Sequence, residues 1–471
     1  MSDPLSVSKD SAESRLAAEP ALTAAQSKGL WGMSRPLFVE QALQLSVPIL
    51  DIFFLSRISD SAAAAAGAMT PVIFFCVNIL WITVFAGSSV AGQRLGAGDR
   101  EKTLATIATY SVWILIAGCL LALLLYLASP WVCHVMGLPG QIETDAVTYL
   151  QAICAIMIVW AFKMIFQTIL NIFGLPQWNM LANIVFFICN VLFCSAVVFQ
   201  WFGMPQYGIV GVAYASILAA IIAVFVSGFF VFTRLNLALS WKSFTKEFLP
   251  SSRHTLRIAL PSMIEPMSFD LNMMVLNGFA ASLGAAALAA KIYTFNTFLI
   301  GLVITLALTM ATEILICQYV GSGSYEKAVR QMRQSLKAAL WGSAILVVIL
   351  LLLHRPIIGL YTDDEWIISA SFWLFLLAAL SEPPRAVNVM VGGTLRATGD
   401  GLLISIVGPL FTWIVAIPAA YCMVFLLHWG IYGILLSAIL DEGVRSIFYW
   451  RRWKANKWHH THVYALEAKA V

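Results

Sequence analysis

The feature that most constrains this chain is a succession of long apolar stretches separated by short polar segments. A helix needs about 20 mostly apolar residues to cross the hydrocarbon core of a bilayer. We therefore predict an all-α polytopic membrane protein with twelve transmembrane helices, and we expect the fourth and tenth to tilt or bend because they run long. The twelve stretches are 36–56, 68–92, 105–128, 146–171, 179–201, 207–233, 257–281, 290–317, 332–354, 366–394, 401–426 and 429–450.

The composition agrees with a protein embedded in a lipid bilayer. Charged residues make up 11% of the chain and hydrophobic residues 60%, whereas soluble domains carry about 25% charged residues. The net charge of +4 is small and no long basic tract is present, so we expect no nucleic-acid partner. The first 28 residues contain no apolar core of signal-peptide length, and we expect a disordered cytosolic tail there without a cleaved signal.

The positions of Lys and Arg predict the orientation. With both termini in the cytoplasm, almost all of the 28 Lys and Arg residues fall in cytosolic segments, and the outer segments hold only Arg57, Lys291 and Arg355. Lys163 and Arg385 lie within predicted spans. Positive residues are enriched on the cytosolic side of membrane proteins. We therefore expect a multi-pass protein of the bacterial inner membrane with both termini in the cytoplasm.

The two halves of the chain repeat one another. The segment 36–40 opens with proline and ends with glutamate, as does 261–265, which follows 225 positions later. At the same offset, the Gln-x-x-Gly-x-Gly pattern in 93–102 returns in 318–327. Six spans in each half give both halves the same direction of insertion, so we expect two pseudo-symmetric six-helix bundles related by an axis along the membrane normal. The predicted parts are a disordered tail 1–34, an N-terminal lobe 35–233, a cytosolic linker 234–256, a C-terminal lobe 257–450 and a basic cytosolic tail 451–471.

Three acidic residues lie in the opening spans of the halves. Counted from Arg35 and Arg257 at about 1.5 Å per residue, Asp51 lies about 24 Å from the cytosolic edge, Glu40 about 8 Å and Glu265 about 12 Å. Acids are costly in lipid and usually functional there, so Asp51 is a candidate site for a proton or sodium ion, the alternative being a structural acid. Glu40 shares the helix face of Asp51, which we expect to line a cavity. Glu40 and Glu265 are candidate gate or substrate residues, or acids that stabilise a helix N-terminus.

Further polar residues lie in later spans. Asp270 is another candidate for substrate binding or gating. In the tenth span, adjacent prolines at 383 and 384 are expected to break the helix, and Glu382 and Arg385 can pair, with a substrate role or a purely structural one. Asp441, Glu442 and Arg445 form a similar group for which a structural role is favoured. Asn190 and Lys163 are weaker polar signals.

No sequence pattern indicates an enzyme. The chain has no Walker A segment, no Gly-x-Ser-x-Gly, no His-Glu-x-x-His and no Cys/His set with metal-ligand spacing. We expect no catalytic residues, no metal site and no cofactor. Any active transport must then draw on a gradient of H⁺ or Na⁺.

These features together resemble the MATE family of multidrug and toxic compound extrusion transporters, as a member of a bacterial branch. The resemblance covers about residues 30–450 and rests on Pro36 followed by Asp51, on Gly96-Ala-Gly98-Asp99, and on the Leu-Arg-x-x-Gly-Asp segment at 395–400. It implies twelve helices in two lobes, a central cavity and export of drugs driven by entering protons or sodium ions.

The resemblance also implies roles for particular residues. Asp51 falls on the acid implicated in cation binding in the N-terminal lobe, and Asn190 resembles the asparagine of the same site, with Cys194 where one branch has an aspartate. The carboxyl-lobe glutamate and aspartate of another branch correspond to Phe269 and Arg385 here. The resemblance therefore places the coupling ion at Asp51 and Asn190.

We expect a secondary antiporter that exports amphipathic, often cationic, drugs or metabolites in exchange for H⁺ or Na⁺ by alternating access, acting as a monomer on small-molecule substrates. The alternative is a flippase for a lipid-linked or amphipathic metabolite on the same fold. A lipid-linked substrate favours a basic cavity, and only Lys163 and Arg385 supply positive charge at depth. The third alternative, a membrane-embedded enzyme, lacks any catalytic group of residues.

Overall fold

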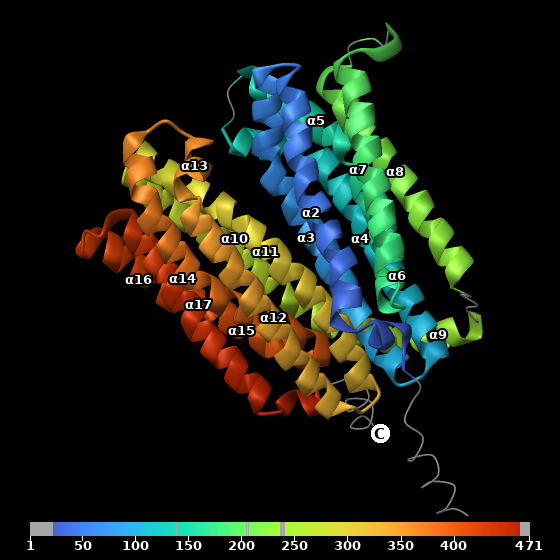
Figure 1. Cartoon of the computed structure of the whole chain (residues 1–471). Helices are drawn as coiled ribbons and strands as arrows, with labels where there is room; N and C mark the ends of the chain where they lie inside the picture. Colours follow the sequence, from blue (N-terminus) through green and yellow to red (C-terminus); the bar gives the residue numbers. More distant parts are fainter. Residues whose placement is uncertain (1–21, 138–139, 204, 206, 236–240, 462–471) are drawn as a thin grey trace, which may run out of the picture.

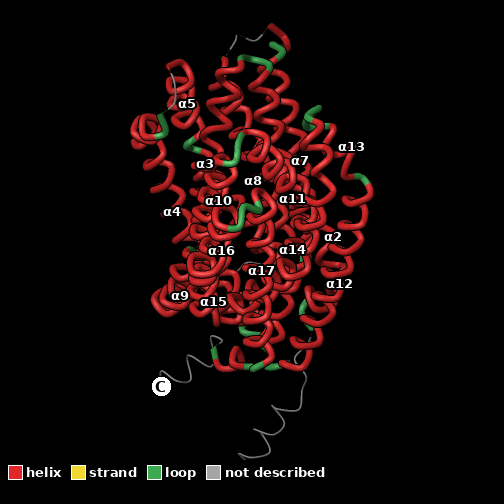
Figure 2. Tube along the Cα trace, turned by 90° about the vertical axis from the view of Figure 1, so that its left-hand side faces the viewer, coloured by secondary structure: helices red, strands yellow, loops and turns green. Residues whose placement is uncertain are grey.

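The computed structural model describes residues 22–137, 140–203, 205, 207–235 and 241–461. Within these ranges the regular structure is helix alone, as Figure 2 shows. The helices of the N-terminal half are α2 (Ala24–Ser56), α3 (Asp60–Gly96), α4 (Arg100–Val135), α5 (Gly140–Ile153), α6 (Ile156–Ile172), α7 (Pro176–Val198), the short η1 (Trp201–Gly203) and α8 (Gly208–Arg234). They form one bundle in Figure 1, coloured blue to green.

The second bundle, yellow to red in Figure 1, contains the remaining helices. Between the bundles, α9 (Trp241–Ser262) packs on α3 and α4 and leads into α10, so the segment expected as a linker is largely helical. The second bundle consists of α10 (Ile264–Ser282), α11 (Ala285–Gly321), α12 (Tyr325–Leu352), α13 (His354–Gly359), α14 (Glu365–Leu395), η2 (Arg396–Asp400), α15 (Gly401–Phe411), η3 (Thr412–Ala416), α16 (Ile417–Tyr421), η4 (Cys422–Leu426), α17 (Gly430–Lys454) and η5 (Lys457–His460).

These elements account for the twelve predicted spans. By length and composition, 8 described segments can cross a membrane, or 9 when the bent pair α5 and α6 counts as one span. One of them, Glu365–Leu426, is 62 residues long and corresponds to two predicted spans. The two predicted spans that remain are the seventh and the twelfth. They correspond to α10 and α17, whose polar residues lower their hydropathy. The prediction of an all-α protein with twelve membrane helices in two bundles is confirmed.

The predicted bends are confirmed in one place and corrected in another. The fourth span bends by 44° between α5 and α6. In the tenth span, by contrast, α14 continues through Pro383 and Pro384 to Leu395, so the predicted break at the prolines is wrong. Membrane helices tolerate proline where neighbouring groups satisfy the freed backbone. Beyond α14 the chain departs from helical geometry at Gly399, where φ is 96°, a conformation that glycine adopts without a steric cost.

The predicted disordered tail 1–34 is too long, because α2 begins at Ala24; residues 1–21 lie outside the described ranges. Thr23 and Gln26 form a reciprocal capping box that satisfies backbone donors at this helix start. Leu30, Met33 and Leu37 of the same segment are buried in an apolar cluster with residues of α11 and α14. Burial of these side chains orders the segment, and it ties the start of α2 to the opposite bundle.

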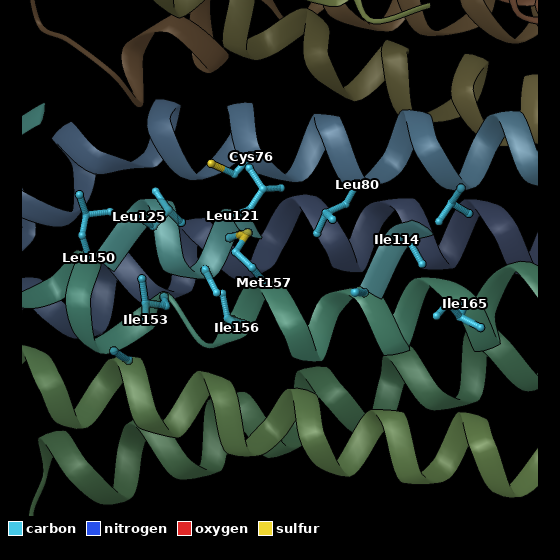
Figure 3. Close-up of a cluster of buried hydrophobic side chains, with 14 of the residues drawn as sticks. Cys76, Leu80, Ile114, Leu121, Leu125, Leu150, Ile153, Ile156, Met157 and Ile165 are labelled. Carbon is cyan, nitrogen blue, oxygen red and sulfur yellow. The ribbon is translucent and has the colours of Figure 1, made fainter. Parts of the chain in front are cut away.

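Each lobe has its own apolar core. In the N-terminal lobe, α3, α4, α5 and α6 contribute side chains such as Leu80, Ile114, Leu121, Leu150 and Met157, which are distributed along these helices in Figure 3. Phe54 and Leu55, near the C-terminal end of α2, belong to the same cluster. Helix α2 therefore begins against the C-terminal lobe and ends within the core of the N-terminal lobe.

The lobes meet where the C-terminal ends of α3 and α11 cross. A side chain at Gly96 would collide with the backbone of Gln318, and one at Gly321 would collide with the backbone of Gln93, so both glycines are needed for this close approach. Gln93 Nε2 donates to the carbonyl of Ala397 at 2.8 Å, and Gln318 Nε2 donates to the carbonyl of Ile172 at 2.8 Å. The repeated motif of the sequence thus forms a reciprocal contact between the lobes, which we call the α3–α11 crossing.

Candidate functional site

A cavity of about 190 Å³ lies within the N-terminal lobe. Its walls come from α2, α3, α5, α6, α7 and α8, and Asp51 lies on the wall formed by α2. Apolar and aromatic side chains such as Trp160 and Phe186 make up most of the lining. A mostly apolar cavity with a few polar groups is typical of a binding site for a small organic molecule.

Neutral side chains surround the carboxylate of Asp51. Asn190 Nδ2 donates to Asp51 Oδ1 at 3.3 Å, and Ser216 Oγ lies 3.3 and 3.4 Å from the two carboxylate oxygens. Cys194 Sγ lies 3.9 Å from Asp51 Oδ1. Among the described residues, no ion pair involves Asp51. Its negative charge is therefore solvated by an amide and a hydroxyl, without a cationic side chain in contact.

The structure brings Asp51 and Asn190 together, as the sequence analysis expected. Ser216 was missed, because a serine in the apolar run that forms α8 gives no sign of the helix it faces. Asn190 Oδ1 is buried and has no hydrogen-bond partner among the described residues. The site thus combines a carboxylate, a hydroxyl and a free amide oxygen, which are the oxygen ligands that hard cations prefer.

Glu40 does not line this cavity, which corrects the expectation that the face it shares with Asp51 lines one cavity at both acids. The residue is fully buried, with 0% of its surface exposed. Gln167 donates to Glu40 Oε1, and Asn179 Nδ2 donates to Oε2 at 2.5 Å. Gln167 itself lines the cavity, so a layer of amides separates the acid from the open space.

Lys163 is the one basic residue among the described residues that line this cavity. It is buried, and its Nζ lies 4.3 Å from the ring centre of Phe186. A lysine in this position interacts with the negative face of the ring. The cavity therefore holds one acid and one base on separate parts of its wall.

The C-terminal lobe holds a network of charged side chains. Arg385 Nη1 lies 2.7 Å from Glu382 Oε1, and Arg385 Nε lies 3.6 Å from Glu442 Oε1. Arg445 Nη2 lies 2.7 Å from Asp441 Oδ2 and 3.5 Å from Glu442 Oε2. The expected pairing of Glu382 with Arg385 is confirmed. Glu442 joins this pair to the Asp441 and Arg445 pair in one network, which the sequence analysis treated as two separate groups.

This network borders a cavity of about 80 Å³ between α10, α11, α14 and α17. Arg385, Asp441, Glu442 and Arg445 line it together with Lys291. Asn388 Nδ2 donates to Glu442 Oε2 at 2.5 Å and adds a neutral partner. Each carboxylate of the network thus contacts an arginine, which distinguishes this cavity from that of Asp51.

The other two acids of the C-terminal lobe lie elsewhere. Glu265 pairs with Arg396, close to the α3–α11 crossing. Asp270 is exposed and borders a cavity of about 10 Å³ with Phe75 and Asn78 of α3. Its neighbour Phe269 does not border this small cavity but lines the cavity of about 80 Å³ next to the charge network. The five candidate gate or substrate residues therefore occupy four separate places, and only Glu382 and Arg385 are in contact. The described residues hold no group of three or more His, Cys, Asp or Glu side chains suited to a metal ion.

Comparisons with known proteins agree with this architecture. The family model MatE matches residues 36–195 and 261–422, one match in each lobe. The chain is 29% identical over 431 residues to the uncharacterized transporter YisQ of Bacillus subtilis, a match that covers 91% of this chain and 94% of the relative. It is 25% identical over 433 residues to the probable multidrug resistance protein NorM of Thermotoga maritima, covering 92% of this chain and 93% of the relative.

Solved structures share the fold. One of them, described as the outward-facing conformation of a multidrug resistance MATE family transporter of the MOP superfamily, superposes with a TM-score of 0.84. The superposition covers 93% of this chain and 97% of that one, at 20% sequence identity. The family match spans most of both lobes and includes Asp51, Asn190 and the α3–α11 crossing. The chain therefore belongs to the MatE family of multi-pass membrane transporters.

Proposed function

We propose that this transporter exports amphipathic, often cationic, small molecules from the cytoplasm in exchange for H⁺ or Na⁺. The observation that carries the proposal is the carboxylate of Asp51, which lies on the wall of a mostly apolar cavity and whose partners among the described residues are neutral. A carboxylate in such a place can take a proton or a sodium ion without displacing a protein cation. The names of NorM and of the outward-facing relative support drug export as the class of activity.

The proposed cycle uses one site for two occupants. In the outward-facing state, H⁺ or Na⁺ binds at Asp51 and Asn190 and displaces the organic substrate. Reorientation of the two lobes then exposes the cavity to the cytoplasm, where the ion leaves and new substrate binds. The contacts at the α3–α11 crossing must open for this step, because they join the lobes at one end. Glu40, Glu265, Asp270, Glu382 and Arg385 act in this proposal as gate or structural residues.

The proposed setting is the bacterial inner membrane with both termini in the cytoplasm. The distribution of Lys and Arg supports this orientation, and so does the bacterial origin of the relatives. We propose a functional monomer, because each lobe has its own core and the cavity at Asp51 is formed within one chain. No cofactor beyond the coupling ion enters the proposal.

The test is efflux from proteoliposomes that contain the purified full chain. A panel of organic cations is loaded, and pH and sodium gradients are imposed separately. We expect efflux of at least part of the panel that depends on one of the two gradients. A parallel assay follows movement of a fluorescent lipid between leaflets. Lipid movement without any gradient-driven efflux would contradict the proposal and favour the flippase.

A further inference from the structure

A third cavity, of about 80 Å³, lies between the lobes beside the α3–α11 crossing. Helices α3 and α6 of one lobe and α11 of the other form its walls. Ser88, Ser89, Thr168 and Asn171 line it from the N-terminal lobe, and Glu313 lines it from the C-terminal lobe. Neither Glu313 nor Asn171 was singled out in the sequence, because both lie in apolar runs without a second acid nearby. We call this cavity the inter-lobe pocket.

Two polar side chains of the inter-lobe pocket are buried without a partner. Glu313 is 8% exposed, and it makes no hydrogen bond or ion pair with the part of the chain that the structure describes. Asn171 is 5% exposed, and its Oδ1 has no hydrogen-bond partner there. The positive charge that acts on Glu313 from a distance is Arg396, which pairs with Glu265. Neither acceptor is therefore satisfied within the described protein.

The surroundings of Glu313 leave space for its carboxylate. A side chain at Gly393 would collide with Glu313 Oε1, so the glycine accommodates the acid. The hydroxyls of Ser88 and Ser89 both donate to the carbonyl of Phe85 at 2.8 Å. Each hydroxyl uses its hydrogen on this carbonyl, so its oxygen can act only as an acceptor for a further partner. The inter-lobe pocket thus presents a carboxylate, an amide oxygen and hydroxyl oxygens.

This set of groups selects the charge and the size of a ligand. A buried carboxylate is costly unless a positive group compensates it. The two groups without a partner in the described part of the chain, the carboxylate of Glu313 and Oδ1 of Asn171, are both acceptors. The negative charge of Glu313 therefore favours a cation as the missing partner. One carboxylate suits a single positive charge, whereas divalent ions draw on several. One water molecule takes up about 30 Å³ in the liquid, so the pocket has room for a small ion with its water or for an ammonium group.

We propose that the inter-lobe pocket binds a small monovalent cation, either an alkali ion or the ammonium group of a cationic substrate, between Glu313 and Asn171. The repeat places this site near the axis that relates the lobes, because Ser88 and Glu313 are counterparts at the same offset of 225 as Gln93 and Gln318. The two lobes each supply ligands. Separation of the lobes at the crossing takes these ligands apart, so the bound cation favours the state in which the crossing is closed.

The experiment measures binding through thermal stability and does not depend on transport. The purified full chain carries Asp51→Asn, so that the cavity of the N-terminal lobe no longer holds a carboxylate. Its unfolding midpoint is followed as sodium chloride, or in a second arm ethylammonium chloride, replaces N-methyl-D-glucamine chloride at constant ionic strength. A cation that binds the folded protein raises the midpoint in a concentration-dependent way. A rise of the midpoint with sodium chloride identifies an alkali ion as the ligand. A rise with ethylammonium chloride identifies an ammonium group.

Variants of the two proposed ligands act in opposite directions. We expect Glu313→Gln to raise the apparent Kd by about tenfold or more, because a charge-assisted contact is lost. Asn171→Asp, which keeps the shape and adds a carboxylate, lowers the Kd. The matched control is Glu326→Gln, which removes the same charge from the exposed first turn of α12 and leaves the titration unchanged. If Glu313→Gln does not fold, Asn171→Leu tests the other ligand and also raises the Kd.

Two results would overturn the inference. The first is an Asp51→Asn protein whose midpoint rises with neither cation. The second is a Glu313→Gln protein that responds to cations as its parent does. Both results leave the exchange proposed for Asp51 untouched, because that exchange is measured separately as efflux by the chain without the Asp51 substitution.

Discussion

Asp51 of the N-terminal lobe and the acids of the charge network in the C-terminal lobe have opposite surroundings. Asp51 contacts an amide, a hydroxyl and a thiol. Glu382 and Glu442 contact Arg385, and Asp441 contacts Arg445. Both groups lie in membrane helices and border cavities. The difference lies in which partner compensates the negative charge.

This difference separates two uses of a buried carboxylate. An acid that already contacts arginine gains little from a further cation, and its loss leaves the arginine uncompensated. An acid with neutral partners has no such counter-charge and can bind and release an ion. The comparison supports the ion exchange proposed for Asp51 and predicts a structural role for the charge network of the C-terminal lobe. Four predictions test this assignment.

The largest effect is expected from Asp51→Asn. The amide keeps the shape of the side chain but carries no negative charge, so it takes up no proton at neutral pH and cannot compensate the charge of a sodium ion. We expect gradient-driven efflux from proteoliposomes to fall to the rate without a gradient, while the amount of folded protein stays the same. Efflux at the unmodified rate would remove Asp51 from the coupling mechanism.

The second prediction concerns the stability of the C-terminal network. Arg385→Met leaves the buried Glu382 without its closest positive partner, at a cost of about 3–5 kcal/mol in the free energy of unfolding. The double variant with Glu382→Gln removes both charges and should be less destabilised than Arg385→Met alone. Thermal unfolding of the purified variants in detergent measures the destabilisation of each variant relative to the unmodified chain. A double variant as unstable as the worse single variant would show that the pair does not compensate.

The third prediction compares two acids outside the network. Glu265→Gln breaks a partly exposed ion pair with Arg396, and such pairs contribute about 1 kcal/mol or less. We expect efflux to slow by less than about tenfold and to keep its dependence on the gradient. Asp270→Asn should behave in the same way. Loss of all gradient dependence in either variant, with dependence retained in Asp51→Asn, would move the coupling site to the C-terminal lobe.

The smallest effect is expected from Ser216→Ala, which removes one donor to Asp51. A long hydrogen bond of this kind contributes about 1 kcal/mol, so the concentration of coupling ion that gives half-maximal efflux should change by about fivefold. The matched control is Ser227→Ala in the same helix, because Ser227 Oγ is buried and has no hydrogen-bond partner in the described part of the chain. Equal behaviour of the two variants would mean that Ser216 does not support the site.

The two glutamates at matched positions of the repeat show how far pseudo-symmetry extends. Glu40 and Glu265 follow equivalent prolines 225 positions apart. Glu40 is nevertheless held by the amides of Gln167 and Asn179, whereas Glu265 pairs with Arg396. The repeat preserves the helix on which each acid lies. The neighbouring helices have diverged and give each acid a different partner.

The number of spans, their grouping in two bundles and the importance of Asp51 could be predicted from the amino-acid sequence, because they depend on local hydropathy and on the cost of charge in lipid. It also indicated Asn190 as a partner of Asp51 through the family resemblance, and the pairing of Glu382 with Arg385 through their spacing on one helix. These properties are set within one helix or by its surrounding bilayer.

The contacts between side chains of distant helices could not be predicted and became visible in the folded structure. Ser216 joins Asp51 from α8, Glu442 joins Arg385 from α17, and the amides around Glu40 come from α6 and α7. The pocket at Glu313 exists because α3, α6 and α11 converge beside the crossing. The sequence shows the hydropathy of each of these helices, but their rotation and crossing depend on packing between side chains far apart in the chain.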